Sequence, residues 1–292
     1  MLAAILGNAC HTAEALCYAK PLGQITVAAP YNVPFVAPLA NGHPVILLLD
    51  TGAEQSLLTP SAAERIGAQA PRVEFRRQMH GAAGSLSTRE VELRSFSAGG
   101  VEIPWRRLLV APVAIPAPLG IDLDGLLGTD VLSGFDIDLD LPHHRMMFYR
   151  KQSCQDAPPW SEPYMEIGTG RSRGEHLFFS ARLDGRRIVA FVDTGTQRSI
   201  LTQKSALALG ITRETLERDP SITTKDAAGT LLTSHVHRFA NLMVGSEVIH
   251  NPALVVTNVN LEDADVILGL DFLRFRRIWL SYALLRIFLS KP

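Results

Sequence analysis

Cysteine is scarce in this chain of 292 residues, which contains only Cys10, Cys17 and Cys154. Three cysteines are too few for the disulfide framework that stabilises many small secreted proteins. Cys10 and Cys17 could pair if the chain is exported, although free thiols are the simpler interpretation. Long apolar runs are also missing, because no stretch of about 18 uninterrupted apolar residues occurs. We therefore expect no membrane span.

The chain also lacks an excess of charge of either sign. It has 28 Lys and Arg against 29 Asp and Glu, a formal net charge of -1. Because such a protein has no overall field that attracts nucleic acid or an anionic membrane, we expect neither as a partner. What remains is an ordinary globular composition, 47% hydrophobic and 20% charged, with a length that suits about two domains. The 18 Pro and 22 Gly favour many short strands and turns.

Residues 1–24 form an N-terminal segment that resembles a signal-peptide core only in part. The apolar run of residues 2–7 is shorter than the roughly 7–15 residues of such a core, and no Lys or Arg precedes it. The segment is therefore interpreted as a possible remnant of a signal. We expect an exported or periplasmic protein if the true start lies upstream, and a cytoplasmic one otherwise.

The tripeptide Asp-Thr-Gly occurs twice, at Asp50-Thr51-Gly52 and at Asp193-Thr194-Gly195. Each copy follows an apolar segment and precedes a Ser, two aliphatic residues and a Thr. A Leu-Gly pair ends 78 residues after the first Asp (128 − 50) and 76 residues after the second (269 − 193). The chain is thus an internal duplication with a period near 143 residues (193 − 50), which is too long for a solenoid repeat.

Two Asp turns in two homologous halves predict one shared site. Homologous lobes pack readily about a pseudo-twofold axis, which places equivalent loops face to face. Two carboxyl groups a few Å apart cannot both ionise cheaply, so the pair holds one proton. The ionised member can take a proton from a bound water while the protonated member donates a hydrogen bond to a scissile carbonyl. Asp50 and Asp193 are therefore candidate catalytic residues for amide hydrolysis, a reaction that here needs no metal or cofactor.

The residues around the two aspartates suit such a site. Glycine after each Thr allows the two loops to approach closely. The two Thr hydroxyls could tie the loops together across the axis, and the Leu-Gly pairs could pack beneath them. These supporting residues are Thr51, Gly52, Ala53, Thr194, Gly195 and Thr196 in the loops, and Leu127, Gly128, Leu268 and Gly269 beneath them.

The residue that follows each tripeptide differs between the halves. The side chain of Ala53 cannot form a hydrogen bond, whereas that of Thr196 can. A hydrogen bond to a charged group favours the charged form. The sequence therefore predicts that Thr196 favours ionised Asp193 and leaves Asp50 as the more readily protonated partner.

The two Asp-Thr-Gly motifs, taken with Leu126-Leu127-Gly128 and Ile267-Leu268-Gly269, resemble those of the retropepsin-like aspartic proteases. The resemblance covers about residues 25–150 and 175–290, and this chain looks like a single-chain duplication similar to bacterial predicted aspartyl proteases. It implies an all-β fold with few short helices and two β-barrel lobes related by pseudo-twofold symmetry. It also implies a hairpin flap in each lobe, over a polypeptide substrate in extended conformation. The flaps would comprise Gly81, Ala82, Ala83 and Gly84 in one lobe and Ala227, Ala228 and Gly229 in the other.

The expected organisation is an N-terminal lobe at 25–150, a linker at 151–174 rich in Pro, Gly and Ser, and a C-terminal lobe at 175–292. We expect a monomer whose two lobes form an intrachain pseudo-dimer. Pairing between lobes of different chains is the alternative. The predicted function is that of an aspartic endopeptidase. The rival is a non-catalytic peptide-binding or assembly module that retains the fold.

Other charged and ligating residues are predicted to have ordinary roles. Asp136, Asp138 and Asp140 alternate along an expected strand and are predicted to face water. The histidines at 143, 144, 235 and 237 do not match a zinc pattern with Cys154, so no metal site is predicted. The basic cluster at 274–277 is predicted to form ion pairs at the interface between the lobes.

Overall fold

The computed structural model of the chain describes residues 20–71, 76–81, 84–112, 121–151, 157–171, 175–225, 231–261 and 263–292. Over these residues the chain is mainly β-strand, with five short α-helices of four to six residues and one 3-10 turn. The all-β prediction is confirmed. The three cysteines lie outside the described residues, and so does nearly all of the N-terminal segment.

The two halves contain the same sheet, which confirms the duplication. In the N-terminal half the strand order is β2 (Phe35–Val36), β5 (Leu47–Leu49), β12 (Gly125–Leu127), β6 (Leu57–Leu58), β11 (Arg107–Val110), β8 (Gly84–Glu92) and β7 (Arg76–Gly81). In the C-terminal half the corresponding order is β17 (Leu177–Leu183), β18 (Arg186–Val192), β25 (Val266–Leu268), β19 (Ile200–Thr202), β24 (Ala253–Thr257), β21 (Leu231–Arg238) and β20 (Ser221–Lys225). In both halves the strand that precedes the Asp turn lies parallel to the strand that carries the Leu-Gly pair.

The remaining strands differ in how they join these sheets. In the N-terminal half, β3 (Leu39–Ala40), β4 (His43–Pro44), β9 (Phe96–Ala98) and β10 (Val101–Glu102) form a separate sheet. In the C-terminal half, β17 and β18 are longer, and β22 (Asn241–Val244), β23 (Glu247–His250) and β16 (Gly170–Arg171) extend the main sheet. The expected turn at Asn41-Gly42 is confirmed, with φ of 53° and 83°, the left-handed values that a two-residue hairpin turn of this kind requires.

The short helices occupy equivalent places in the two halves. They are α1 (Pro60–Arg65) and α3 (Gln203–Ala208), α2 (Thr129–Leu132) and α5 (Leu270–Leu273), and in the C-terminal half also α4 (Arg213–Arg218). The Thr that closes each Ser-aliphatic-aliphatic-Thr segment is the N-cap of the next helix. Thr59 accepts a hydrogen bond from the Ala62 N–H, and Thr202 accepts one from the Ser205 N–H. No helix in the described part of the chain is long and apolar enough to cross a membrane.

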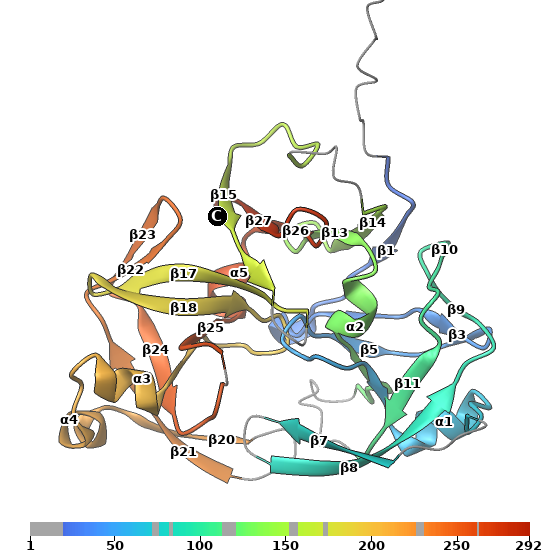
Figure 1. Cartoon of the computed structure of the whole chain (residues 1–292), viewed down its shortest axis with the longest axis horizontal. Coiled ribbons are helices and arrows are strands. Elements are labelled where there is room, and N and C mark those ends of the chain that lie inside the picture. Colours follow the sequence, from blue (N-terminus) through green and yellow to red (C-terminus); the bar gives the residue numbers. More distant parts are fainter. Residues whose placement is uncertain are drawn as a thin grey trace, which may run out of the picture.

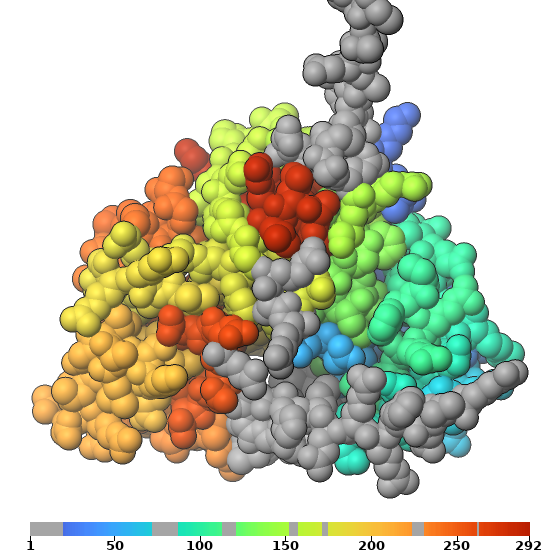
Figure 2. All heavy atoms as spheres, viewed as in Figure 1, coloured from blue at the N-terminus to red at the C-terminus, as the bar shows by residue number. Residues whose placement is uncertain are grey.

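A six-stranded sheet joins the two lobes (Figure 1). Its order is β1 (Gly23–Thr26), β14 (Arg145–Tyr149), β13 (Asp136–Asp140), β26 (Arg277–Ser281), β27 (Arg286–Ser290) and β15 (Tyr164–Gly168). The antiparallel pair β13 and β26 brings equivalent strands of the two halves together at its centre. In Figure 2 the N-terminal lobe, mainly blue and green, and the C-terminal lobe, mainly yellow and orange, lie to either side. One apolar core runs through both lobes and one face of this sheet.

The expected linker contains regular structure, so that expectation is wrong for part of its length. Strand β15 pairs with β27 at one edge of the six-stranded sheet, just as β1 pairs with β14 at the other edge. The two strands are therefore equivalent by pseudosymmetry, although their sequences, Gly-Gln-Ile-Thr and Tyr-Met-Glu-Ile-Gly, show no repeat. We infer that the repeats begin at β1 and β15, earlier than residues 25 and 175.

Asp136, Asp138 and Asp140 do not face water, which corrects the prediction made from their alternation. Their exposures are 2%, 0% and 1%, because the polar face of β13 is covered. Trp160 of the linker donates a hydrogen bond to Asp138 (3.1 Å), and Arg277 of β26 binds the same carboxylate through Nε (2.9 Å) and Nη2 (2.8 Å). The predicted ion pairing between lobes is confirmed for Arg277.

Removal of the Arg277 side chain should destabilise the protein strongly. Arg277→Ala leaves the carboxylate of Asp138 buried without its cation, which costs about 3–5 kcal/mol of unfolding free energy in comparable sites. The matched control is Arg274→Ala, which removes an exposed arginine from the same cluster and should change stability by less than about 0.5 kcal/mol. Urea unfolding of the two variants measures the difference. Equal stabilities would contradict the central role of the Arg277–Asp138 pair.

Candidate active site

Asp50 and Asp193 lie at equivalent points, directly after β5 and β18. The backbone N–H of Asp50 donates to the carbonyl of Leu127 (3.1 Å), and that of Asp193 donates to the carbonyl of Leu268 (2.9 Å). Each aspartate is therefore fixed by the Leu-Gly strand of its own lobe. The prediction that the Leu-Gly pairs lie beneath the two turns is confirmed.

The glycines of the four motifs are required by close approach. A Cβ atom on Gly195 would lie 2.5 Å from the carboxyl carbon of Asp50, and one on Gly52 would meet the carboxyl group of Asp193. A Cβ on Gly128 would meet the carbonyl oxygen of Ala53 (2.7 Å), and one on Gly269 would meet the backbone of the 196–198 turn. Each aspartate therefore lies against the turn of the opposite lobe, which places the two carboxyl groups in one site.

Thr51 and Thr194 tie the two turns together reciprocally. The hydroxyl of Thr51 donates to the carbonyl of Val192 (2.9 Å) and accepts from the N–H of Thr194 (3.1 Å). The hydroxyl of Thr194 donates to the carbonyl of Leu49 (2.5 Å) and accepts from the N–H of Thr51 (3.2 Å). Both threonines are buried, so these four bonds are shielded from water. The carbonyls belong to the residues directly before the two aspartates, so the bonds fix the relative position of the carboxyl groups.

A second pair of polar contacts, which we did not predict, supports each turn. The carboxylate of Asp130 accepts from the N–H (2.9 Å) and hydroxyl (2.6 Å) of Ser56, whose oxygen accepts from the N–H of Gly128 (2.9 Å). Asp271 and Ser199 form the same contacts in the other lobe. The signal was present in the sequence, since both the serines and these aspartates recur at equivalent positions.

Burial raises the pKa of both Asp50 and Asp193. For Asp193 the nearby carboxylate of Asp50 raises the pKa further, well above its usual range. For Asp50 a side-chain hydrogen bond with Asp193, the N–H groups of Gly52 and Ala53, and the charge of His176 oppose the effect of burial. The shared proton therefore resides on Asp193, and Asp50 is the member that ionises.

The prediction for Thr196 is consequently wrong. Its hydroxyl donates to the carbonyl of Arg198 (3.3 Å), away from the dyad, and its side chain is exposed. The carbonyls of Ala53 and Thr196 instead anchor the helices that follow the Leu-Gly pairs, accepting from the N–H groups of Thr129 (2.8 Å) and Leu270 (2.9 Å). The two loops are unequal in the direction opposite to the one expected.

His176 is a further residue of the site that we did not predict. It is 8% exposed and precedes β17, and its Nε2 lies 3.0 Å from the carbonyl oxygen of Gly52 in the other lobe. A nitrogen that contacts a carbonyl oxygen in this way must carry the hydrogen and donate it. Nothing in the repeat pointed to this residue, because the equivalent position of the first half is Val33 (176 − 143).

The two expected flaps are hairpins on the side of the molecule opposite the six-stranded sheet. They are β7 with β8 and β20 with β21, which approach each other from the two lobes at the bottom of Figure 1. Gly81 and Gly84 pair at the end of the first hairpin, as expected. The remaining flap residues of the prediction, Ala82, Ala83, Ala227, Ala228 and Gly229, lie outside the described residues.

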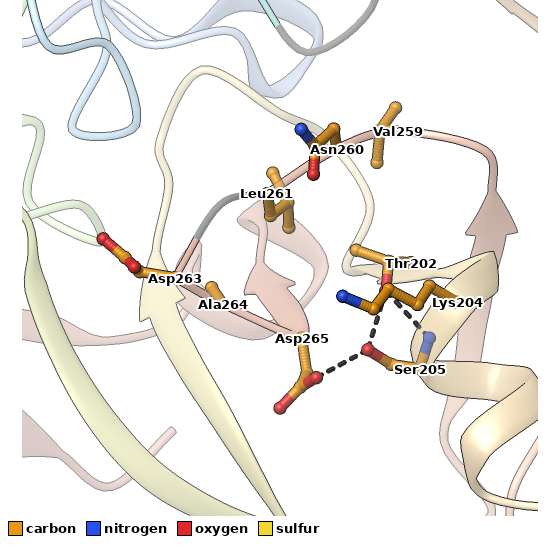
Figure 3. Close-up of a pocket in the computed structure, with 9 residues that line it drawn as sticks. All are labelled: Thr202, Lys204, Ser205, Val259, Asn260, Leu261, Asp263, Ala264 and Asp265. Carbon is orange, nitrogen blue, oxygen red and sulfur yellow. Dashed lines mark hydrogen bonds between the residues drawn. The ribbon is translucent and has the colours of Figure 1, made fainter.

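A surface pocket of the C-terminal lobe does not contain the dyad (Figure 3). It lies between the start of α3 and the loop before β25, and its acidic residue Asp265 is already engaged. One oxygen of Asp265 accepts from the hydroxyl of Ser205 (2.5 Å) and the other from the N–H of Val189 (2.8 Å). The pocket is thus part of the framework of the lobe.

Comparison with known protein families agrees with this arrangement. Residues 36–131 match the family described as aspartyl protease, and residues 179–275 match the family described as "gag-polyprotein putative aspartyl protease". Each match covers one half of the duplication and includes one Asp turn. The chain belongs to the retropepsin-like aspartic proteases. The two-lobe architecture of this retropepsin-like protein follows from the tandem arrangement of the two matches.

Solved structures place this retropepsin-like chain in the same fold as longer two-lobe enzymes. The crystal structure of the aspartic proteinase from Irpex lacteus is similar with a TM-score of 0.55 and 15% sequence identity, over 92% of this chain and 97% of that one. At this identity the likeness shows the fold alone. No curated protein sequence matches the chain.

Substitution of Thr51 should weaken the junction of the two lobes of this retropepsin-like protein. Thr51→Val keeps the shape of the side chain but leaves the Val192 carbonyl and the Thr194 N–H unpaired, at a cost of about 1–3 kcal/mol of unfolding free energy. Thr51→Ser retains the hydroxyl and is the matched control, expected to lose much less. Chemical unfolding compares the two variants. A serine variant as unstable as the valine variant would contradict the role of the hydroxyl.

Neutralisation of Asp193 should change how stability depends on pH. Its pKa is raised in the folded protein, so the bound proton stabilises the fold fully below the unfolded pKa of about 3.9, and this contribution disappears as the pH rises through the folded pKa. Asp193→Asn does not titrate there. Its stability relative to the wild type should therefore increase as the pH rises above about 4. Urea unfolding between pH 4 and 7.5 measures this trend, which exposed Asp263→Asn should not show.

Proposed function

We propose that the chain is an aspartic endopeptidase in which Asp50 and Asp193 activate a water molecule between the two lobes. The observation that supports the proposal most directly is the reciprocal packing of each aspartate against the glycine turn of the other lobe. This packing brings two buried carboxyl groups together with one proton between them. A pair of this kind supplies a general base and a general acid at the same point.

The roles of the two carboxyl groups follow from their unequal surroundings. Asp50 is the base, because the N–H groups of Gly52 and Ala53 stabilise its ionised form. It removes a proton from the water that attacks the scissile carbonyl carbon. Asp193 keeps the shared proton and donates a hydrogen bond to the carbonyl oxygen, on which negative charge develops. The proton taken up by Asp50 is then available to the leaving amine.

The proposed substrate is a polypeptide in extended conformation. The strands of the two flap hairpins lie over the side of the molecule where the lobes meet, opposite the joining sheet. An extended peptide can bind such strands through main-chain hydrogen bonds, which give affinity with little dependence on sequence. The site therefore suits an unfolded or flexible segment of a protein.

One chain is proposed to be sufficient for the site. Both aspartates, the reciprocal threonine bonds and the six-stranded sheet are formed within one chain. We therefore favour a monomer over pairing between lobes of different chains. The units of this pseudo-dimer are proposed to start at β1 and β15.

The decisive test is cleavage of a diverse peptide library between pH 3 and 8. Wild type should cleave peptides, and Asp50→Asn should lower the rate by at least about 10²-fold, the contribution of a general base. Asp184→Asn, a change in an exposed turn far along the chain from either motif, is the matched control and should retain activity.

Two outcomes would reject the proposal. If wild type cleaves no peptide but retains peptides in a pull-down, the chain is a peptide-binding module with the fold of a protease. If Asp50→Asn cleaves as fast as wild type, the hydrolysis does not use the dyad. In either case the variant should keep a normal unfolding transition, so that a loss of activity is not a loss of fold.

A further inference from the structure

His176 breaks the pseudosymmetry of the two halves at the point where it matters to the dyad. In the first half Phe35 pairs with Leu48, and in the second Phe179 pairs with Ala190. The sums of these positions, 83 and 369, differ by 286, which is twice 143, so the strand registers are equivalent. Position 176 thus corresponds to Val33 in structure as well as in sequence. Valine has no hydrogen-bond donor, so the turn of the other lobe receives no such bond from that position.

The hydrogen bond of His176 ends on the peptide group that faces Asp50. Its Nε2–H donates to the carbonyl of Gly52, and the N–H of the same peptide group, which belongs to Ala53, faces the carboxylate of Asp50. The preceding N–H, that of Gly52, donates to Asp50 Oδ1 (3.0 Å). A donor on the carbonyl polarises the peptide and strengthens the bond that its N–H makes on the other side. The three groups form a chain from the imidazole to the carboxylate.

The imidazole ring is held in place by aromatic neighbours of its own lobe. It stacks on Phe191 at 5.0 Å with an interplanar angle of 24°, and it lies 5.9 Å from Phe178. Phe191 belongs to the strand that ends at Asp193, so the ring is positioned by the same element as the second aspartate. The orientation of the donor is therefore fixed before any substrate binds.

The charged groups that face His176 both come from the other lobe. They are Glu54, which is exposed, and Asp50. Burial lowers the pKa of His176, while the two carboxylates and the bond to Gly52 oppose this effect. A neutral imidazole acts on Asp50 through the peptide, and a protonated one adds a positive charge beside it. Both forms favour the ionised carboxylate.

We propose that His176 is a positioning residue of the dyad, which orients the peptide between Gly52 and Ala53 from the opposite lobe and so assigns the role of general base to Asp50. The inference rests on the proposed function. It adds a residue outside the repeated motifs, and it accounts for the unequal roles of two halves that are otherwise alike.

The kinetic test is the pH dependence of kcat/KM for a peptide that wild type cleaves. His176→Val introduces the residue found at position 33, and its acidic limb should move to higher pH by about 0.5 pH unit or more, because the carboxylate of Asp50 loses support. His176→Gln retains an N–H donor and should restore the limb in part. His250→Val, which removes a hydrogen-bonded histidine from β23, should leave the limb unchanged. An unchanged limb in His176→Val, or no restoration by Gln, would overturn the proposal while peptide cleavage itself still stands.

A second measurement does not depend on turnover. The NMR titration of the His176 imidazole, assigned through its loss in His176→Gln, should move to lower pH in Asp50→Asn, because a neighbouring negative charge is removed. A titration identical in the two proteins would overturn the coupling of His176 to Asp50. If the titration moves but wild type cleaves no peptide under any condition, the placement of His176 is supported and the proposed function fails instead.

Discussion

The structure depends on a single electrostatic constraint, the meeting of two buried carboxyl groups that share a proton. Such a pair is unfavourable unless the surrounding groups hold it rigidly and compensate for lost hydration. The reciprocal bonds of Thr51 and Thr194 provide the rigidity, because each binds the carbonyl that precedes the other lobe's aspartate. The glycines provide the room, and the Leu-Gly strands fix each aspartate from below. The six-stranded sheet then holds the two lobes in the orientation that this contact needs.

Much of this arrangement could be predicted from the sequence, because it is repeated. The two Asp-Thr-Gly turns, the Leu-Gly pairs, the capped helices and the Asn41-Gly42 hairpin all depend on local backbone chemistry, which leaves the same residues at equivalent positions. Two occurrences at one spacing made the pairing of Asp50 with Asp193 a reasonable expectation. The structure places them as predicted, and their chemical roles remain to be tested.

The features that could not be predicted depend on contacts between segments far apart in the chain. Strand β15 has no sequence resemblance to β1, because an edge strand is selected for pairing through its backbone and its side chains are free to vary. The aspartates of β13 alternate as solvent-facing residues do, yet Trp160 and Arg277 cover them. The reading of Thr196 failed for the same reason: a side chain next to a motif in sequence turns away from it, whereas His176, 124 residues from Gly52, reaches it.

The strand pair β13 and β26 has a consequence for how the site would respond to dilution. In an enzyme made of two separate chains, the shared site exists only above the concentration at which the chains associate. Here the strands that join the halves belong to one covalent chain, so their effective concentration is set by the connection between the lobes and not by the amount of protein present. A site built in this way would remain assembled even when very few molecules are present.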